Sequence, residues 1–403
     1  MMKDNFKKVG FGIVGLGGRA KSLASVVTTH KEGYVAHICD LKKEVVERFK
    51  AHLSEEEKEL VHTSQDYSKV LSDNAVDAVI IATPDGMHAK MAIQAFDANK
   101  HVFLEKPVGI NLEENHDILH KAVDSGKIFQ VGYQGRCLPF FKAIKQIIDQ
   151  GNDGVLGRPL FVQANELYYG GYHYFRSWWR LRKNIGGIMY QKISHDFDYL
   201  YWLFGEPERI SCFGSNIEFR EGNAPKGSSA KLCRDCPPEE WCQYHVKDDD
   251  SLSRKTDHCV YNSKHDIVDN TQTLIQFQNG LVVCLGMHFF PSKAQNGRTI
   301  KISGSKADLF GKINEEVIQI DPRFDRSANQ NQSFVYKIPK AKYKVVYDLI
   351  DDFIHGINTN TRVEPSVKSA YWSTIMVAAA QIAMDSKKVV ELAELTSKYP
   401  FPG

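Results

Sequence analysis

Three features that would each define a class of protein are missing from this 403-residue sequence. No uninterrupted apolar run reaches the roughly 18 residues that a membrane-spanning helix needs, so no membrane partner is expected. No charge dominates, because 51 Lys and Arg residues stand against 49 Asp and Glu residues, a balance too even for a nucleic-acid-binding surface. No cleavable apolar segment follows the opening MMKDNFKK, which predicts a cytoplasmic location. We therefore expect the partner to be a small molecule.

Cysteine is also sparse. Eight cysteines are spread over the chain without an export signal, which argues against a disulfide framework. What the chain does have is the composition of a globular protein, with 42% hydrophobic and 25% charged residues. Its length predicts about two to three domains.

Strand-like and helix-like patterns alternate over the first third of the chain. The strands that we expect there cover residues 9–14, 34–40, 75–83, 101–107 and 127–133. They are too apolar to have a wet face, and segments of helical periodicity such as PDGMHAKMAIQAFDANK separate them. Residues 1–133 are therefore predicted to form an α/β domain, a doubly wound parallel sheet covered by helices on both faces.

From about residue 134 the pattern changes, and residues 134–403 are predicted to form a second, α+β domain. Its strand candidates are separated by hairpin-length turns such as QNG, which predicts a large, mainly antiparallel sheet. A polar, Cys-containing insertion at residues 220–265 interrupts these strands. Two C-terminal helices are expected within residues 342–388, the first with a continuous apolar stripe.

The glycine-rich stretch GFGIVGLGGRAKS points to a ligand. The first strand ends at Val14, and a G-x-G-x-x-A loop follows, in which backbone can approach a pyrophosphate and a helix N-terminus can receive its charge. Asp40 ends the second strand, 20 residues beyond Ala20, where an acid would bond ribose hydroxyls and repel a 2′-phosphate. The alternative is a glycine-rich turn that binds nothing. The pattern favours a Rossmann domain that binds NAD, and its candidate loop residues are Gly15, Gly17, Gly18, Arg19 and Ala20.

Segments along nearly the whole chain resemble one family. GIVGLGGRA, IIATPDGMH, VFLEKPVGINLEE and QVGYQGR are similar, in order and spacing, to the dinucleotide-binding half of the glucose-fructose oxidoreductase / inositol dehydrogenase (Gfo/Idh/MocA) family. GVLGRPLFV, GGIMYQKISHDFDYLYWLFG and VVELAEL resemble its second domain and C-terminal end. The resemblance implies an NAD-binding domain followed by a domain for substrate binding and oligomerisation.

The resemblance implies roles for five residues of the first domain. Thr83, Pro84 and His88 would lie along the nicotinamide half of the cofactor. Glu105 and Lys106, in the strand-end EKP, would lie where cofactor and substrate meet. The Lys106 ammonium can hydrogen-bond a substrate hydroxyl and stabilise alkoxide character. The alternative is a surface Glu-Lys pair before a turn-making proline.

His195 stands in QKISHDFD where the family usually carries its catalytic histidine. An imidazole with a pKa near ~6.5 can take a hydroxyl proton and return it. If residues 188–204 are helical, Gln191, His195 and Tyr199 share a face that would look into a cleft. The alternative is a histidine bonded to a neighbouring carboxylate such as Asp198.

Gln191 departs from the family pattern, because dehydrogenases of the family commonly have an aspartate four residues before this histidine. A glutamine can orient a hydroxyl but cannot carry a proton, which leaves the reaction type open. Lys192 and Asp196 have the i, i+4 spacing of an ordinary helical ion pair, and we predict that pair.

Aromatic and basic residues crowd YYGGYHYFRSWWRLRK, residues 168–183. Sugar sites often stack an apolar ring face on Tyr or Trp, so Tyr172, together with Gln134, is a substrate-binding candidate. Packing of this segment on a core or at a subunit interface is the alternative.

Four cysteines of the insertion form a metal-site candidate. Cys233 and Cys236 have C-x2-C spacing, and Cys242 and Cys259 follow, with His245 able to replace the last. This set suits a structural zinc site. Disulfides or thiols without a metal are the alternatives.

These features give one leading function and two rivals. The first is an NAD(H)-dependent dehydrogenase of a sugar, sugar derivative or cyclitol. The second is a redox-neutral, NAD-dependent enzyme of the same family that cleaves a glycoside. The third is a sugar sensor that binds NAD without turnover. A homodimer or homotetramer is expected, because an antiparallel sheet leaves one face to cover.

Overall fold

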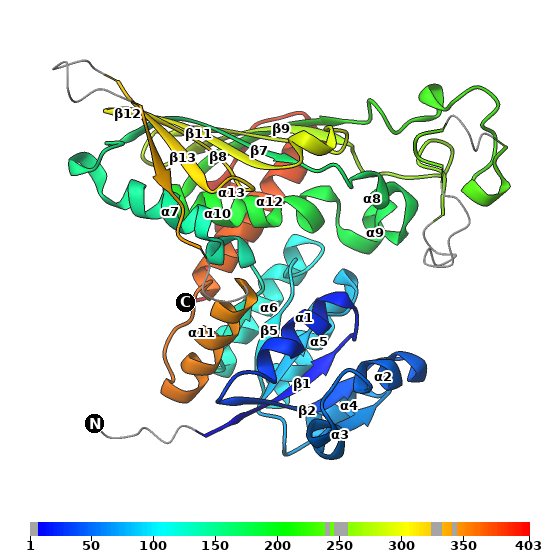
Figure 1. The fold of residues 1–403 in the computed structure, drawn as a ribbon. Helices are drawn as coiled ribbons and strands as arrows, with labels where there is room; N and C mark the ends of the chain where they lie inside the picture. The colour runs from blue at the N-terminus through cyan, green and yellow to red at the C-terminus, as the bar shows by residue number, and fades with distance from the viewer. Residues whose placement is uncertain (1–6, 238–241, 246–256, 324–332, 341–344) are drawn as a thin grey trace. The chain divides into compact units, whose positions relative to one another are not determined.

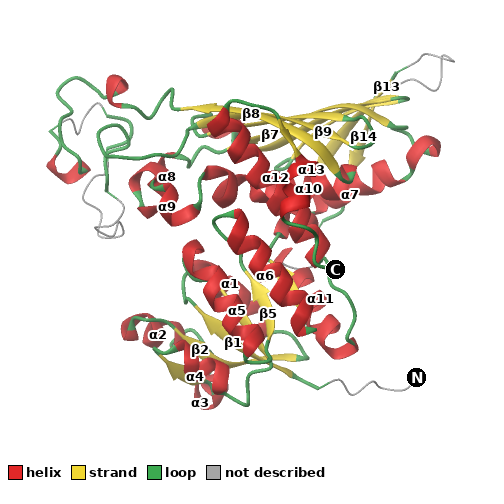
Figure 2. Ribbon diagram, turned by 180° about the vertical axis from the view of Figure 1, so that it is seen from behind, coloured by secondary structure: helices red, strands yellow, loops and turns green. Residues whose placement is uncertain are grey.

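The computed structural model describes residues 7–237, 242–245, 257–323, 333–340 and 345–403, and the chain forms two compact units (Figures 1 and 2). Unit 1 contains Met1–Phe141, Lys340–Ile375 and Lys398–Gly403. Unit 2 contains Lys142–Pro339 and Met376–Ser397. These units divide the chain differently from the boundary predicted at residue 133, since the chain returns to unit 1 near its C-terminal end.

Unit 1 is built on a six-stranded sheet in the order β3-β2-β1-β4-β5-β6. Every neighbouring pair is parallel. The strands are β1 (Val9–Val14), β2 (Gly33–Cys39), β3 (His62–Ser64), β4 (Ala78–Ile81), β5 (His101–Leu104) and β6 (Phe129–Val131). The predicted doubly wound parallel sheet is confirmed, with the short edge strand β3 as an addition.

Helices cover both faces of this sheet. Those of unit 1 are α1 (Gly18–Val27), α2 (Lys43–Lys50), α3 (Glu55–Leu60), α4 (Tyr67–Ser72), α5 (His88–Asp97), α6 (Leu112–Ser125) and α11 (Val345–Thr359), with the first half of α12 (Val367–Ser386). Local chemistry sets their ends. Asn111 caps α6 by accepting a hydrogen bond from the Glu114 amide, and Gly126 ends it in the left-handed conformation.

The apolar stripe predicted for the first C-terminal helix is present on α11. Its buried residues join α1 and α2 in one hydrophobic cluster on the sheet. The Phe353 ring lies 6.2 Å from that of Phe11 on β1 and 5.7 Å from that of Phe103 on β5. A segment that lies 250 residues or more downstream in the sequence thus packs against strands β1 and β5.

Unit 2 contains a nine-stranded sheet in the order β14-β13-β12-β11-β7-β10-β9-β8-β15. All its pairings are antiparallel except that of β10 with β7, so the predicted, mainly antiparallel sheet is confirmed. The strands are β7 (Pro159–Leu167), β8 (Pro207–Ser215), β9 (Asn270–Phe277), β10 (Val282–His288), β11 (Gly297–Gly304), β12 (Ala307–Lys312), β13 (Val317–Pro322), β14 (Phe334–Lys337) and β15 (Val390–Glu391).

One face of this sheet is buried and the other is exposed. The helices around it are α7 (Pro139–Asp149), α8 (Tyr172–Arg176), α9 (Arg182–Ile185), α10 (Ser194–Phe204), the second half of α12 and α13 (Leu392–Lys398). Burial alternates along β9, where Thr273 and Ile275 are buried and Leu274 is 51% exposed. The large exposed apolar residues of the strands are Leu160, Phe161, Phe213, Leu274, Val282, Phe310, Phe334 and Val335. We call the outward-facing surface of this sheet the open face.

Within the described residues, no helix is both long and apolar enough to cross a membrane.

Candidate active site

The carboxyl ends of β1 and β4 meet where the strand order of unit 1 reverses, the usual place for a ligand in an open α/β sheet. Gly15 follows β1 with a φ of +81°, a conformation that side chains rarely adopt. A Cβ at this position would lie 2.7 Å from the Ala82 carbonyl oxygen and 2.8 Å from the Thr83 Cα. The loops after β1 and β4 therefore touch, and only glycine fits between them.

The next two glycines leave space in front of α1. Gly17 is the N-cap residue of α1 and supplies no side-chain cap. A Cβ at Gly17 or Gly18 would meet no atom within 4 Å, whereas Ala20 is fully buried against the sheet. The amides that open a helix need acceptors, and an anion in this space would supply them. The loop therefore fits a dinucleotide pyrophosphate.

Asp40 lies beside the same loop. One oxygen of its carboxylate accepts a hydrogen bond from the Leu16 amide at 3.0 Å, and the other accepts one from the Lys42 amide at 3.1 Å. Each oxygen keeps a lone pair for a further donor. These contacts fix the carboxylate where the adenosine ribose of a dinucleotide is expected.

Arg19 joins the loops that follow β1, β5 and β6. Its Nε donates to Glu105 Oε1 at 2.5 Å, and its Nη1 donates to Gln134 Oε1 at 3.0 Å. Among the described residues its Nη2 is buried without a hydrogen-bond partner. Glu105 is only 7% exposed, which argues against the alternative of a surface ion pair between Glu105 and Lys106. Gln134, predicted to bind substrate, is engaged here with Arg19.

His88 lies between two loops and contacts a backbone carbonyl oxygen of each. It is 1% exposed, with Nδ1 2.6 Å from the Pro107 carbonyl oxygen and Nε2 3.0 Å from that of Thr83. It thereby ties the loop after β4 to the turn that follows Lys106. The Thr83 hydroxyl is buried and has no hydrogen-bond partner within the described chain, as suits a group that awaits a ligand. Pro84, next to it, is exposed.

In unit 2, His195 is the second residue of α10, directly after a π-helical turn at Met189–Ile193. Such turns are frequent at functional sites. Gln191 lies in that turn, 6% exposed, and its Oε1 accepts a hydrogen bond from the Tyr174 hydroxyl at 2.9 Å. The predicted face of Gln191, His195 and Tyr199 assumed α-helical spacing, which the π turn breaks. Tyr199 is 1% exposed, and burial raises its pKa well above the usual value.

A buried ionic network underlies this turn, and it corrects one prediction. Lys192 pairs with Glu166 at 3.0 Å, not with Asp196. Asp196, fully buried, receives two hydrogen bonds from Arg298, at 2.8 and 2.9 Å, and Arg298 also lies 2.8 Å from Glu166. Burial raises the pKa of the Asp196 carboxyl, and Arg298 opposes that shift. The physical reason is that β7 and β11 bring Glu166 and Arg298 side by side, a pairing that local spacing does not reveal.

The side chains of the aromatic segment 168–183 pack in two different places. The Tyr174 ring stacks on Phe289, with centroids 5.1 Å apart and planes 8° apart, next to Gln191. The Tyr172 ring instead lies 5.5 Å from Tyr244 of the insertion, with the Arg176 guanidinium 5.3 Å from it. Tyr172 as a substrate-binding residue stays a prediction, and Tyr174 is a neighbour of Gln191 that the sequence did not single out.

The structure does not support the zinc prediction. Among the described residues, the cysteine thiols at 233, 236, 242 and 259 do not form a group of three or more closely placed metal ligands. The buried Arg176 guanidinium interacts electrostatically with Cys233, Cys242 and Cys259, and its positive charge opposes a divalent cation. His245 places Nε2 3.0 Å from the Cys233 carbonyl oxygen. All eight cysteines are thiols.

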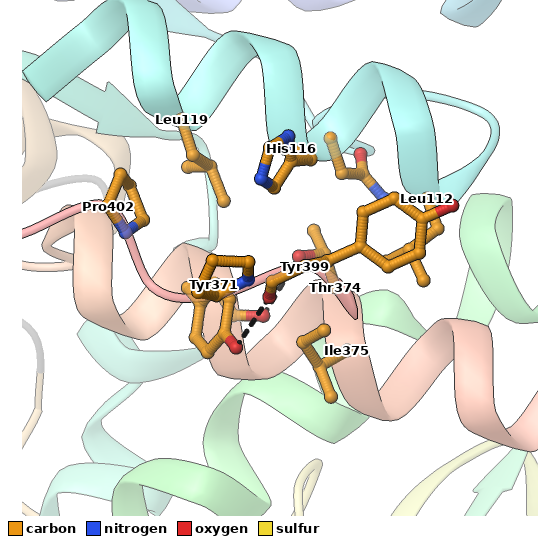
Figure 3. A pocket seen from close by; sticks show the side chains of 10 residues that line it. Leu112, His116, Leu119, Tyr371, Thr374, Ile375, Tyr399 and Pro402 are labelled. Carbon is orange, nitrogen blue, oxygen red and sulfur yellow. Dashed lines mark hydrogen bonds between the residues drawn. The ribbon is translucent and has the colours of Figure 1, made fainter. Parts of the chain in front are cut away.

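A separate pocket of unit 1 contains none of the predicted site residues (Figure 3). Side chains of α6 form one wall, α12 forms another, and the C-terminal residues from Tyr399 close it. Tyr371 donates a hydrogen bond to the Tyr399 carbonyl oxygen at 2.9 Å, and the Tyr399 hydroxyl donates to Glu113 at 2.5 Å. The pocket lies where the C-terminal residues pack against α6 and α12.

A parallel sheet with a glycine loop at its switch point, a helix N-terminus without a side-chain cap and a fixed acid after β2 define a Rossmann-type dinucleotide-binding protein. Residues 9–133 match the NAD-binding Rossmann fold of the oxidoreductase family GFO_IDH_MocA, and residues 141–310 match the C-terminal domain of that family. Together these matches span most of the chain. The chain belongs to the Gfo/Idh/MocA oxidoreductase family.

Curated relatives share the family at low identity. The oxidoreductase YteT of Bacillus subtilis (strain 168) is 28% identical over 62% of this chain and 64% of its own length. A 2,7-anhydro-N-acetylneuraminate hydratase of Escherichia coli (strain K12) is 26% identical over 52% of this chain and 53% of its own length. A scyllo-inositol 2-dehydrogenase (NAD(+)) of B. subtilis is 35% identical over 35% of this chain and 39% of its own length. The chain thus spans less than two thirds of each of these relatives.

Solved structures share the fold over nearly the whole chain. A levoglucosan dehydrogenase in complex with NADH and levoglucosan superposes with a TM-score of 0.75 at 19% identity, over 96% of this chain and 100% of that one. A protein described as an NADPH-dependent oxidoreductase, from Desulfitobacterium hafniense DCB-2, gives the same TM-score and identity over 99% of this chain and 100% of its own. Both units therefore have the architecture of known oxidoreductases.

Proposed function

We propose that this protein is an NAD(H)-dependent dehydrogenase of a sugar, sugar derivative or cyclitol. The observation that carries the proposal is the loop of unit 1, where an open helix N-terminus, a glycine with φ +81° and the fixed Asp40 carboxylate lie together. The substrates for which the levoglucosan and scyllo-inositol dehydrogenases are named support the substrate class.

The proposed chemistry gives each of the predicted catalytic residues a role. The dinucleotide, when bound, supplies a hydride acceptor or donor at its nicotinamide. Lys106 holds the substrate oxygen and stabilises its negative charge, and His195 removes or returns the hydroxyl proton. Gln191, held by Tyr174, orients the hydroxyl without exchanging a proton. Arg19, Glu105, Thr83, Pro84 and His88 shape the cofactor side of the site.

The test is net NADH formation with a panel of aldoses, sugar acids, anhydrosugars and cyclitols. Reduction of NAD with one class of substrate supports a dehydrogenase. A redox-neutral enzyme would convert an activated glycoside or anhydrosugar with no net NADH, and a sensor would bind NAD and sugar without converting either.

The redox-neutral alternative has one specific observation in its favour. Gln191 has an amide in place of a carboxylate, so it cannot serve as a proton carrier. It is buried in the turn before His195 and accepts a hydrogen bond from Tyr174. The hydratases of E. coli and Mediterraneibacter gnavus are named for an anhydro sugar.

Cofactor choice is testable at Asp40. We expect NAD to bind more tightly than NADP, because the carboxylate repels a 2′-phosphate. Asp40→Ala should weaken NAD binding by roughly tenfold, as expected for lost charge-assisted hydrogen bonds, and narrow the preference over NADP. Fluorescence titration of both cofactors measures this, with the exposed Glu44→Ala as control. Tighter binding of NADP by the parent would contradict the prediction.

We also propose a homodimer or homotetramer that covers the open face. Leu274→Asp puts a charge at a 51% exposed position of this face and should shift sedimentation velocity toward the monomer without lowering Tm. The control is Leu60→Asp, at a 67% exposed position that is not part of that sheet. If both variants sediment like the parent, the open face is not the oligomer interface. The cytoplasmic location stays a prediction.

A further inference from the structure

A second cluster of ligand-type side chains lies in unit 1, apart from the residues assigned above. His37 on β2 is paired in register with His62 on the edge strand β3, and Asp73 follows α4. Asp73 Oδ2 lies 2.8 Å from His37 Nδ1 and 2.6 Å from His62 Nδ1. One ligand atom from each of the three residues lies within 4.8 Å of the others.

The hydrogen atoms around His37 can be assigned from its other neighbours. The Ser64 hydroxyl donates its single hydrogen to the Asp66 carbonyl oxygen at 3.0 Å. It can then only accept from His37 Nε2, which lies 3.0 Å away, so Nε2 carries the hydrogen of the imidazole. A neutral imidazole has one N–H, which leaves a lone pair on Nδ1 facing a carboxylate oxygen. Such a contact needs a positive charge between the two atoms.

We propose that His37, His62 and Asp73 bind a divalent transition metal of the zinc class. Two imidazole nitrogens and a carboxylate oxygen are its usual donors, and a water would complete a tetrahedral set. The open position lies on the side of His62, whose side chain is 62% exposed, while those of His37 and Asp73 are 6% and 10% exposed.

The surroundings of the cluster have the form of a supported metal site. Ser64 holds the ring of His37 through Nε2, and the Ala75 amide donates to Asp73 Oδ1 at 2.9 Å, leaving Oδ2 for the metal. Donors about 2.0–2.1 Å from a tetrahedral metal are roughly 3.3 Å apart. The His37–Asp73 distance must therefore widen by roughly 0.5 Å and the His62–Asp73 distance by roughly 0.7 Å. Rotation of the exposed His62 ring allows the second change, and the first needs a small rotation of the buried His37 ring or of the Asp73 carboxylate.

The metal would fasten the edge of the sheet. β3 has only three residues, and its Ser64 carbonyl oxygen lies 3.4 Å from the amide of Asp40. Joining β2, β3 and the end of α4 through one ion stabilises this edge beside the Asp40 loop. The inference concerns a structural site and does not depend on the proposed reaction.

The experiment uses the full chain, stripped with a chelator and titrated with ZnCl₂ and CoCl₂. We expect one ion to bind and raise Tm, because it binds the folded state alone. Loss of an outer partner costs a metal site about 10–100-fold in affinity, so His62→Ala, which removes a ligand, should cost about 100-fold or more. The control His52→Ala removes an exposed histidine of the same unit and should change nothing.

Two further comparisons separate this site from its rivals. The Co²⁺ complex should show tetrahedral visible bands without thiolate charge transfer, and Cys233→Ser with Cys236→Ser should keep it. Asp73→Asn keeps the side-chain shape, and its amide can donate to His37 Nδ1, so that variant should stay folded while binding no metal. Binding that is lost with the cysteines and not with His62 would overturn the proposal. So would a parent chain that binds neither ion, since a proton then fills the gap beside His37.

Discussion

Turnover should fall by on the order of 10²-fold or more when His195 is replaced by alanine, while NAD affinity changes little. His195 stands at the start of α10, after the π turn that holds Gln191, and its proposed role is to exchange the proton of the substrate hydroxyl and not to bind the dinucleotide. Steady-state kinetics with an accepted substrate and NAD titration by fluorescence together measure the split between kcat and cofactor binding.

His195→Gln and His355→Ala sharpen this test. Glutamine can hydrogen-bond but cannot titrate, so His195→Gln should be as slow as the alanine variant and should lose one limb of the pH profile. His355 is exposed on α11, and its removal should leave turnover unchanged. Full activity of His195→Ala with any accepted substrate would refute the assignment.

Arg298→Leu is expected to lower the free energy of unfolding by about 3–5 kcal/mol, the usual cost of leaving a buried charge without its partner. Arg298 is the shared partner of Asp196 and Glu166, which are 0% and 2% exposed. Asp196 is next to His195 in the chain, so activity should fall as well. Urea denaturation of the parent and the variant measures the stability change.

The matched control for Arg298 is Arg182. It also forms a two-point contact with an aspartate, Asp385, at 3.1 and 2.6 Å, but the two side chains are 36% and 45% exposed. Arg182→Leu should therefore cost about 1 kcal/mol or less. Equal losses for the two variants would show that the buried network is no more important than a surface pair. Recovery of stability in Arg298→Leu combined with Asp196→Leu would confirm that unpaired charge causes the loss.

The parallel sheet could be predicted because its determinants are local. β1 covers the predicted residues, and four further strands lie within their predicted ranges or one residue beyond them. The edge strand β3 was missed because His62–Ser64 is short, polar and largely exposed, so no apolar run marks it. The glycine loop and Asp40 could be picked out for the same reason, because a few consecutive residues determine a turn and the end of a strand.

The environment of Gln191 and His195 could not be predicted in full. The resemblance to the family located both residues, but the π turn changed their helical spacing. Glu166 and Arg298 lie far apart in the chain and meet only because β7 pairs with β11. The zinc prediction is not supported for a similar reason, because the spacing of cysteines carries no information about a guanidinium such as Arg176 near them.

The packing of α11 on unit 1 sets an order of events during synthesis. A ribosome that has translated residues 1–141 has made all six strands of the parallel sheet, but not Phe353, whose ring lies against Phe11 and Phe103. Until residue 354 emerges, the apolar surface that Leu349, Ile350, Phe353 and Ile354 later cover has no partner from α11. The nascent first unit therefore waits, with part of its core open, while the 198 residues Lys142–Pro339 of the second unit are translated. The long-range return of the chain makes completion of the cofactor-binding unit depend on prior synthesis of this segment of the second unit.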